Sequence, residues 1–343
     1  MTPELIAAKQ GRIGRIRLNR PAALHALTTD MCVGIIEALA AFERDDTVEA
    51  VVFDHTEGRG FCAGGDIRML ATSGQGDGSD ARTFFHTEYR MNHRLFTYPK
   101  PTVAIMDGIT MGGGVGIALP CRYRVATENT RFAMPETGIG LFPDVGGGWF
   151  LPRLPGQVGT FLALTGARID GAECLALGLA THYLASAGVP DALTALSNNA
   201  YAIAATLKSH GTGAPIARIV ANRAYIDRLF AADSVAEIMT ALEADGSDWA
   251  AKERAILRTK SPLSMAVALR QLREGATMPD FAAEMRQEYA IGARVVHTHD
   301  FIEGVRALII DKDNAPRWTP EVDPAEVDAI FAPLPADQQW TPL

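Results

Sequence analysis

Two glycine-rich stretches decide the fold of this chain: FCAGGDIR at residues 61–68 and GITMGGGVG at residues 108–116. Each stretch follows a run of apolar and β-branched residues typical of a strand, and each precedes a helical pattern. Glycine permits a sharp turn at these points and lets backbone amides approach a ligand closely. Taken alone, the first stretch also fits an ordinary strand-to-helix turn in which Asp66 caps the helix.

Strand and helix patterns alternate outward from these stretches. Strands are predicted at residues 13–18, 48–53, 102–106 and 123–126, and helices at residues 29–42 and 81–98 and from about residues 66 and 112. This alternation predicts an α/β fold rather than a sandwich or a helical bundle.

A change of pattern near residue 200 divides the chain into two predicted parts, residues 1–200 and residues 201–343. The first part holds the alternating strands and helices, whereas the second holds helix-length amphipathic segments. Prolines recur after residue 311, so the last segment is expected to be largely extended, with one short helix.

The composition favours a globular protein that acts on a small molecule. The 343 residues include 32 Lys and Arg against 40 Asp and Glu, a formal net charge of −8, and 48% of them are hydrophobic. An acidic chain without a run of Lys or Arg favours neither nucleic acid nor an anionic membrane as its main partner.

The cysteines and the hydropathy pattern predict a soluble, cytoplasmic protein. Cys32, Cys62, Cys121 and Cys174 are scattered without a CxxC pair, which predicts neither a disulfide framework nor a zinc ribbon. The first 20 residues lack the apolar core of a secretory signal, and no later span of about 20 apolar residues follows.

The two glycine-rich turns fit an oxyanion hole better than a nucleotide site. A GxGxxG frame that begins at Gly112 would need glycine at Ile117, and the chain has no GxxxxGK[ST] motif. Two turns that each aim an N–H group at one point are what an oxyanion hole requires.

Two acidic residues, Glu136 and Asp144, lie eight positions apart in an apolar, glycine-rich segment. No Lys or Arg occurs between Arg131 and Arg153, so both carboxyl groups are candidates for perturbed pKa values and for acid–base or nucleophilic work. The alternative is that Asp144 caps a short helix at residues 145–151 and that Glu136 lies at the surface.

Glu88 is a third candidate, because it interrupts an apolar helical stripe. Phe84, Glu88, Met91 and Leu95 recur at helical spacing on the segment 81–98. A buried glutamate usually has a hydrogen-bonding or charged partner or a functional role. A position at the exposed edge of the stripe would also fit the pattern.

Other catalytic constellations are not indicated. The sequence has no GxSxG elbow and no HExxH motif. His297 and His299 would point apart on a helix, so no metal site is predicted. Cys62 and Cys121 lack a nearby histidine and are interpreted as small buried hydrophobic residues.

Together the motifs resemble the crotonase, or enoyl-CoA hydratase/isomerase, superfamily. The resemblance extends from about residue 13 to residue 320 through FAMPETGIGLFPDVGGGWFLPRL (132–154), LTGARIDGAECLALGLATHYL (164–184), SPLSMAVALRQL (261–272) and HDFIEGVRALIIDKDNAPRWTP (299–320). It implies a spiral of ββα turns in residues 1–200 that binds a CoA thioester, with the helical part 201–343 closing over the acyl site.

The resemblance also implies the site residues. The thioester oxygen is expected between the amides of Gly65 and Gly113, and the substrate contacts are Glu88, Gly113, Glu136 and Asp144. The adenine of CoA is expected along Ala63, Gly64, Asp66 and Ile67. No metal or redox cofactor is implied, since CoA is part of the substrate. The oligomeric state stays open, because the helical regions of this superfamily either pack on their own chain or form trimers.

One position separates two activities within the superfamily. Its hydratases carry a glutamate three residues after the oxyanion glycine and a second one that matches Glu136, whereas this chain has Gly116 at the first position and adds Asp144. Hydrolysis of a short 3-hydroxyacyl-CoA, such as 3-hydroxyisobutyryl-CoA in valine breakdown, is therefore favoured. A hydratase or isomerase and a non-catalytic acyl-CoA-binding protein are the alternatives.

The roles follow from the same resemblance. Glu136 is the attacking carboxylate or the base for water, Asp144 positions the substrate hydroxyl or the water, and Glu88 supports the acyl end of the pocket. The change Gly116→Glu is expected to confer weak hydration, because it restores the missing acid.

Overall fold

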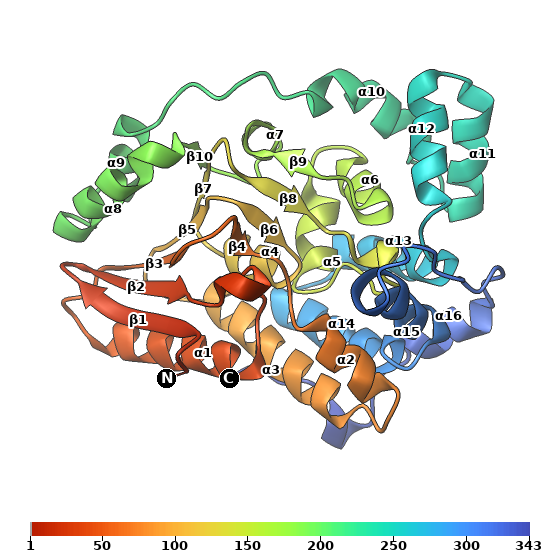
Figure 1. The fold of residues 1–343 in the computed structure, drawn as a ribbon, viewed down its shortest axis with the longest axis horizontal. Coiled ribbons are helices and arrows are strands. Elements are labelled where there is room, and N and C mark those ends of the chain that lie inside the picture. Colours follow the sequence, from red (N-terminus) through yellow and green to blue (C-terminus); the bar gives the residue numbers. More distant parts are fainter. Residues whose placement is uncertain (1) are drawn as a thin grey trace.

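The computed structural model describes residues 2–343 and contains two sheets surrounded by helices (Figure 1). The larger sheet has six strands in the spatial order β1, β2, β3, β5, β7, β10. Their bounds are β1 (Leu5–Gln10), β2 (Ile13–Leu18), β3 (Ala50–His55), β5 (Thr102–Met106), β7 (Tyr123–Ala126) and β10 (His182–Tyr183). Only the β1–β2 pair is antiparallel.

The smaller sheet has four short strands in the order β4, β6, β8, β9. Their bounds are β4 (Gly60–Cys62), β6 (Ile109–Met111), β8 (Arg131–Ala133) and β9 (Ile169–Asp170). The pairs β4–β6 and β6–β8 are parallel, and β8–β9 is antiparallel. Because β4 and β6 are parallel neighbours, the glycine turns that follow them leave the sheet at the same edge.

The chain winds as a spiral, since each turn gives one strand to each sheet and then a helix. The pairs β3/β4, β5/β6 and β7/β8 follow this order. The helices of this part are α1 (Thr29–Arg44), α2 (Ile67–Gly74), α3 (Ser79–Phe96), α4 (Gly113–Ala118), α5 (Gly147–Phe150), α6 (Val158–Thr165), α7 (Gly171–Ala176) and α8 (Val189–Asn198).

The rest of the chain is helical. Its helices are α9 (Ile203–Ser209), α10 (Ile219–Leu229), α11 (Val235–Asp245), α12 (Asp248–Leu257), α13 (Pro262–Ala276), α14 (Phe281–Val295), α15 (His299–Val305) and α16 (Pro324–Phe331). Helix α14 packs on α3, which in turn packs on α1. Among residues 2–343, no helix is both long and apolar enough to cross a lipid bilayer.

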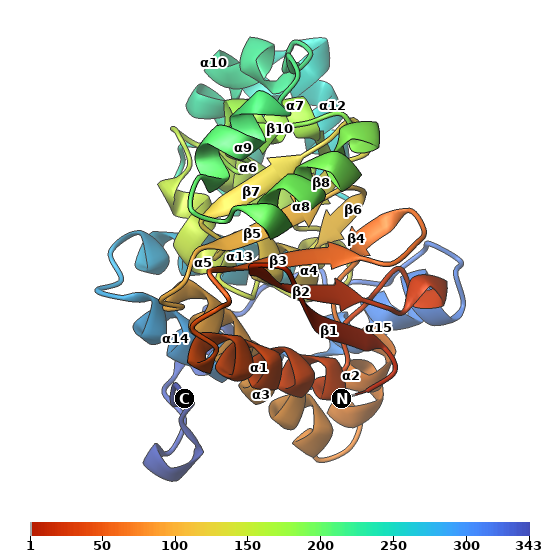
Figure 2. The same cartoon turned by 90° about the vertical axis from the view of Figure 1, so that its left-hand side faces the viewer.

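Two apolar clusters stabilise the arrangement. The larger one joins side chains from β2, α1 and α3 to side chains from α13, α14 and the tail, so it crosses the division predicted near residue 200. The smaller one lies between the larger sheet and helices α8 and α9, on the side that Figure 2 turns toward the viewer. The division into two domains near residue 200 stays a prediction, and one apolar core includes side chains from both parts.

The strands at residues 13–18, 102–106 and 123–126 have the predicted bounds, and the strand predicted at 48–53 begins two residues later. The tail contains one short α-helix, α16, as predicted, and Trp340 beyond it is buried. Strands β4, β6, β8, β9 and β10 were missed because two or three residues cannot show an alternating pattern. Strand β1 was missed as well, because its residues are mostly exposed and do not alternate between apolar and polar.

Candidate active site

The two glycine turns lie side by side at the edge of the smaller sheet. After β4 the chain passes through Gly64, at φ +119°, and after β6 through Gly112, at φ +47°. The N–H of Asp66 donates to the Leu27 carbonyl at 3.1 Å, whereas the N–H of Gly65 has no hydrogen bond within residues 2–343. Gly113 is the first residue of α4, so the helix does not use its N–H either. Two amide donors are therefore available at one edge.

Gly65 and Gly113 both line a cavity of about 70 Å³. It is lined by Ala63, Gly64, Gly65, Ile67, Leu70, Phe84, Phe85, Glu88, Met111, Gly112, Gly113, Pro135, Glu136, Ile139, Leu141 and Asp144. The cavity thus brings together segments that are far apart in the sequence, and its walls are apolar apart from three carboxyl groups and the glycine amides.

Glu136 begins a short 3-10 turn, Glu136–Gly138, between Pro135 and Ile139. Its side chain is buried, and its Oε2 atom has no hydrogen-bond partner in residues 2–343. Burial, and then the charge of Asp144, raise the pKa of Glu136 well above its usual value. The interpretation of Glu136 as a surface residue is therefore wrong.

Asp144 lies in the segment Pro143–Gly148 and is also buried. The Tyr89 hydroxyl donates a hydrogen bond of 2.9 Å to its Oδ2 atom. Burial raises the pKa of Asp144 to about 7, and the Tyr89 hydrogen bond opposes that shift. Helix α5 is capped by Gly146 without a side-chain bond, so the alternative in which Asp144 caps this helix is wrong.

Glu88 is buried within the predicted apolar stripe of α3, among Phe84, Met91 and Leu95. Its Oε1 atom has no hydrogen-bond partner in the described chain. Burial, and then the charge of Asp144, raise the pKa of Glu88 well above its usual value. A Cβ atom added at Gly113 would lie 2.7 Å from that Oε1 atom, so Glu88 closes the cavity next to the second glycine turn.

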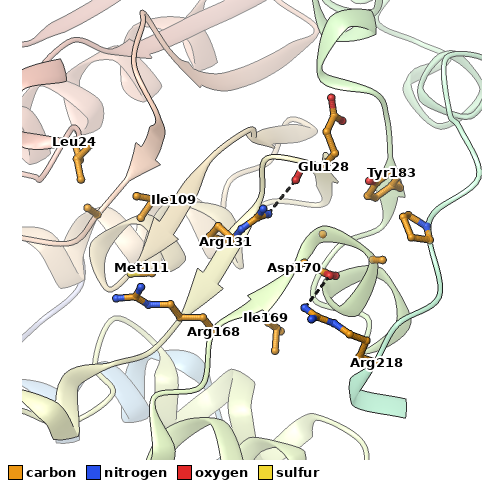
Figure 3. A pocket seen from close by; sticks show the side chains of 14 residues that line it. Leu24, Ile109, Met111, Glu128, Arg131, Arg168, Ile169, Asp170, Tyr183 and Arg218 are labelled. Atoms are coloured by element: carbon orange, nitrogen blue, oxygen red, sulfur yellow. Dashed lines mark hydrogen bonds and ion pairs between the residues drawn. The ribbon is translucent and has the colours of Figure 1, made fainter. Parts of the chain in front are cut away.

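A larger cavity of about 680 Å³ adjoins the first, because Ala63 and Met111 line both. Figure 3 shows Arg131 next to Glu128 and Arg218 paired with Asp170, at 3.6 Å, on its wall. Arg168 also lines this cavity and forms no ion pair within residues 2–343. Burial, and then the charge of Arg168, lower the pKa of the neighbouring Lys260. The larger cavity therefore offers positive charge to an anionic ligand.

The structure separates Asp66 from the other residues predicted along the adenine of CoA. Ala63, Gly64 and Ile67 line the smaller cavity, but Asp66 lines neither of the two. Its carboxylate accepts from the Met69 N–H and pairs with Arg20 at 3.2 Å. Asp66 is thus the N-cap of α2, as the alternative reading of this turn held.

The remaining candidates stay outside the cavity. All four cysteines are free and buried, and burial raises the pKa of both Cys62 and Cys121 to about 12. His297 contacts the Gly74 carbonyl and His299 the Arg317 carbonyl. In the part of the chain described, residues 2–343, no group of His, Cys, Asp and Glu side chains could hold a metal ion.

Sequence reasoning missed Tyr89, Gln271, Glu284 and Glu288, which surround the Asp144 segment. Tyr89 resembles an ordinary core aromatic in the sequence, and Gln271 lies 128 residues after Pro143, whose carbonyl it contacts. The one available signal was the spacing of Glu284 and Glu288, which puts two acids on the buried face of α14.

Comparisons with known proteins identify the family to which this chain is similar. A family model described as enoyl-CoA hydratase/isomerase matches residues 13–331. The 3-hydroxyisobutyryl-CoA hydrolase of Gallus gallus is 43% identical over 96% of this chain and 89% of its own length. The protein of that name from Homo sapiens is 41% identical over 92% of this chain and 84% of its own.

Two solved structures are similar over nearly the whole chain. One, titled a carnitinyl-CoA dehydratase from Mycobacterium thermoresistibile, is 39% identical with a TM-score of 0.94 and covers 99% of both chains. The other, titled an enoyl-CoA hydratase from Rhodobacter sphaeroides 2.4.1, is 41% identical with a TM-score of 0.91 and covers 98% of this chain and 99% of its own. The predicted spiral of ββα turns with a helical C-terminal region is confirmed.

The prediction of a cytoplasmic location is wrong by the same comparison. The relatives from Gallus gallus and Homo sapiens are both named mitochondrial. Unpaired cysteines distinguish an oxidising from a reducing environment, but they do not distinguish one reducing compartment from another.

Proposed function

The chain belongs to the enoyl-CoA hydratase/isomerase family, and from that premise we infer that it hydrolyses the thioester bond of 3-hydroxyisobutyryl-CoA. The products are 3-hydroxyisobutyrate and CoA. One observation carries this inference: two unused amide donors and the buried acids Glu136 and Asp144 face one cavity, while glycine stands at position 116.

The amides of Gly65 and Gly113 are proposed to hold the thioester oxygen. As the carbonyl carbon becomes tetrahedral, its oxygen gains negative charge, and preorganised N–H groups stabilise that charge. Each such donor contributes about 3 to 4 kcal/mol to the lowering of the barrier. Support comes from the cavity itself, because Gly65, Gly113 and Glu136 all line it.

Glu136 is proposed to be the nucleophile. Its carboxylate oxygen forms a bond to the thioester carbon, the C–S bond breaks, and an anhydride between Glu136 and the acyl group results. A carboxylate with few hydrogen-bond partners in an apolar wall is a strong nucleophile once it is ionised, which agrees with the unpartnered Oε2 atom.

Asp144 is proposed to carry the proton. In its neutral form it donates that proton to the leaving thiolate, and it then takes a proton from the water that attacks the anhydride. The pKa of Asp144, raised to about 7 by burial, suits both transfers at neutral pH. Glu88 closes the acyl end of the cavity beside Gly113.

The larger cavity is proposed to receive the nucleotide part of CoA. Ala63 and Met111 join it to the cavity that holds the acids, so an extended ligand reaches both. Arg131, Arg168 and Arg218 match the charge of the CoA phosphate groups. We further propose a role in valine breakdown, because the branched acyl group keeps the branched carbon skeleton of valine.

Hydration of an enoyl-CoA is the competing function, since the two solved structures are titled a dehydratase and a hydratase. The geometry around Gly116 does not favour it. A Cβ atom at this position would lie 2.6 Å from the Val145 Cβ atom and 2.7 Å from the Asn92 Nδ2 atom. The Asp144 segment therefore occupies the space that a glutamate at position 116 would need.

Release of free thiol from a panel of short acyl-CoA esters tests this function, with a thiol-reactive dye as the readout. We expect the highest kcat/KM for 3-hydroxyisobutyryl-CoA and little loss of conjugated absorbance from crotonyl-CoA. Rapid hydration of crotonyl-CoA without thiol release would instead support a hydratase. Tight binding of both esters without turnover would support an acyl-CoA-binding protein.

A further inference from the structure

Two helices from the far end of the sequence hold the segment Pro143–Gly148 on both sides of Asp144. The side-chain amide of Gln271, on α13, donates to the Pro143 carbonyl at 2.9 Å. Glu288, on α14, accepts from the Gly146 N–H at 2.8 Å and from the Gly148 N–H at 3.2 Å. The backbone just before and just after Asp144 is thus bonded to the helical C-terminal part.

This segment needs such support, because its backbone is in an unfavourable conformation. Val145 has φ +54°, in the left-handed region that branched side chains rarely adopt, and Gly146 follows at φ +93°. A conformation of this kind persists only where surrounding contacts determine it. The three bonds from Gln271 and Glu288 are contacts of that kind.

Glu288 accepts through both of its oxygen atoms. Its Oε2 atom takes the Gly146 N–H, and its Oε1 atom takes the Gly148 N–H and a Gln271 N–H at 3.1 Å. All of these donors are buried. Burial and then the charge of Glu284 raise the pKa of Glu288 well above its usual value, whereas the Gly146 and Gly148 N–H groups lower that pKa.

Glu284 lies one turn before Glu288 on the same buried face of α14. Neither of its oxygen atoms has a hydrogen-bond partner in residues 2–343. A Cβ atom at Gly148 would overlap the Glu284 carboxyl group, so that group lies directly against the segment. Two adjacent buried carboxyl groups do not both ionise, and the N–H donors around Glu288 favour the charge on Glu288 and the proton on Glu284.

We propose that Glu288 is the positioning residue for Asp144, with Glu284 holding the proton that keeps the pair singly charged. The helical C-terminal part then does more than cover the acyl site: it sets the position of the acid that moves protons during hydrolysis. This inference rests on the function proposed above for Asp144.

The change Glu288→Gln tests the proposal without a large change of shape. The new side chain has one oxygen atom and one NH₂ group in place of two oxygen atoms. In one orientation the NH₂ group points at the Gly146 N–H, and in the other it points at the N–H groups of Gly148 and Gln271. At least one bond to the segment is lost, and Asp144 shifts. We expect kcat to fall about 100-fold, while the dissociation constant of CoA changes less than threefold, since a displacement of about 1 Å costs about that factor.

A double variant separates positioning from general destabilisation. In the background of Asp144→Asn, the further change Glu288→Gln is expected to alter the residual kcat less than twofold, because the effect of Glu288 passes through the Asp144 carboxylate. A merely structural role would lower kcat by the same factor in both backgrounds, and this result would overturn the proposal.

Two further variants complete the design. Glu253→Gln is the matched control, a buried glutamate of α12 with an unpartnered oxygen that lines neither of the two cavities, and it should keep the wild-type kcat. If Glu288→Gln does not fold, Gln271→Met removes the bonds to Pro143 and Glu288 and should lower kcat about tenfold. Unchanged kcat in that variant contradicts the proposal, whereas full activity of Asp144→Asn contradicts the proposed function instead.

Discussion

The glycine turns form a donor wall of the cavity, and the stretch that carries Glu136 and Asp144 forms an acidic wall of the same cavity. The two walls are built in different ways. Gly65 and Gly113 are placed by the strands β4 and β6 that immediately precede their turns, and these strands are neighbours in one sheet. Asp144 is placed by Tyr89, Gln271 and Glu288, which come from helices distant in the sequence.

This difference shows which catalytic groups depend on the local sequence alone. The oxyanion donors are backbone groups, so a short motif with the right turn specifies them almost completely. The acids need a defined charge state as well as a position, and both depend on burial among residues that the local sequence does not contain. Changes to the two walls should therefore have different signatures.

The largest effect is expected at the acidic wall. Glu136→Ala removes the proposed nucleophile and should lower kcat at least about 10³-fold while the thioester still binds, because binding depends largely on the CoA contacts. Hydroxylamine added during turnover of the wild type should convert some Glu136 to a hydroxamate, detected by peptide mass. Single turnover in ¹⁸O-water should also leave label in that peptide.

The outcome for Glu136 distinguishes two mechanisms. Full loss of activity in the variant, without trap or label in the wild type, would indicate that Glu136 only deprotonates water. Retained activity would remove Glu136 from the mechanism.

The donor wall is expected to give the next largest effect. Gly113→Pro removes one oxyanion N–H at the first position of α4, where proline is otherwise tolerated, and should lower kcat at least about 100-fold. Gly113→Ala keeps the N–H and adds only a carbon atom close to Glu88, so it measures the steric part of the effect. Equal rates in the two variants would place the oxyanion hole elsewhere.

Gly116 lies on α4 against Val145 of the Asp144 segment, and the structure changes what we expect of it. Weak hydration by Gly116→Glu was predicted from the resemblance, but the contacts with Val145 and Asn92 leave no room for the side chain. We expect a loss of stability of about 3 kcal/mol in chemical denaturation and no hydration of crotonyl-CoA. Measurable hydration by a folded variant would show that the Asp144 segment can move aside.

The pH dependence of stability probes the support of the acidic wall. Burial raises the pKa of Glu284 from 4.5 to about 7, so its protonated form stabilises the fold below about pH 4.5. That stability is lost as the pH rises through 7. Glu284→Gln should therefore remove about 2 kcal/mol of pH dependence between pH 4.5 and 7.5, measured by urea denaturation. An unchanged profile would mean that Glu284 is not the protonated member of the pair.

The smallest effect is expected outside both walls, in the larger cavity. Arg168→Gln should raise KM about fivefold for an acyl-CoA and leave KM unchanged for the same acyl group on pantetheine, which lacks the nucleotide. Arg44→Gln, at the exposed end of α1, is the matched control. An equal rise of KM for both esters would argue against a phosphate contact at Arg168.

Much of the cavity could be predicted from short motifs. The two turns, the burial of Glu88 in an apolar stripe and the candidacy of Glu136 and Asp144 all followed from spacing. The partners of Asp144 could not, because Gln271 and Glu288 lie 127 and 144 residues after it in the sequence. Asp66 shows a different limit, since its carboxylate caps a helix and its contact with CoA stays a prediction from the motif.

By itself, the sequence determined the local structure: where strands end in glycine turns, which helix face is apolar, and which acids lie in apolar surroundings. These features depend on backbone freedom and periodicity over a few residues. Only the tertiary structure decided which acids share a cavity, which carboxylate receives N–H donors and why position 116 has no room for a side chain. Charge state and free space depend on contacts between distant segments, and such contacts exist only once the chain is folded.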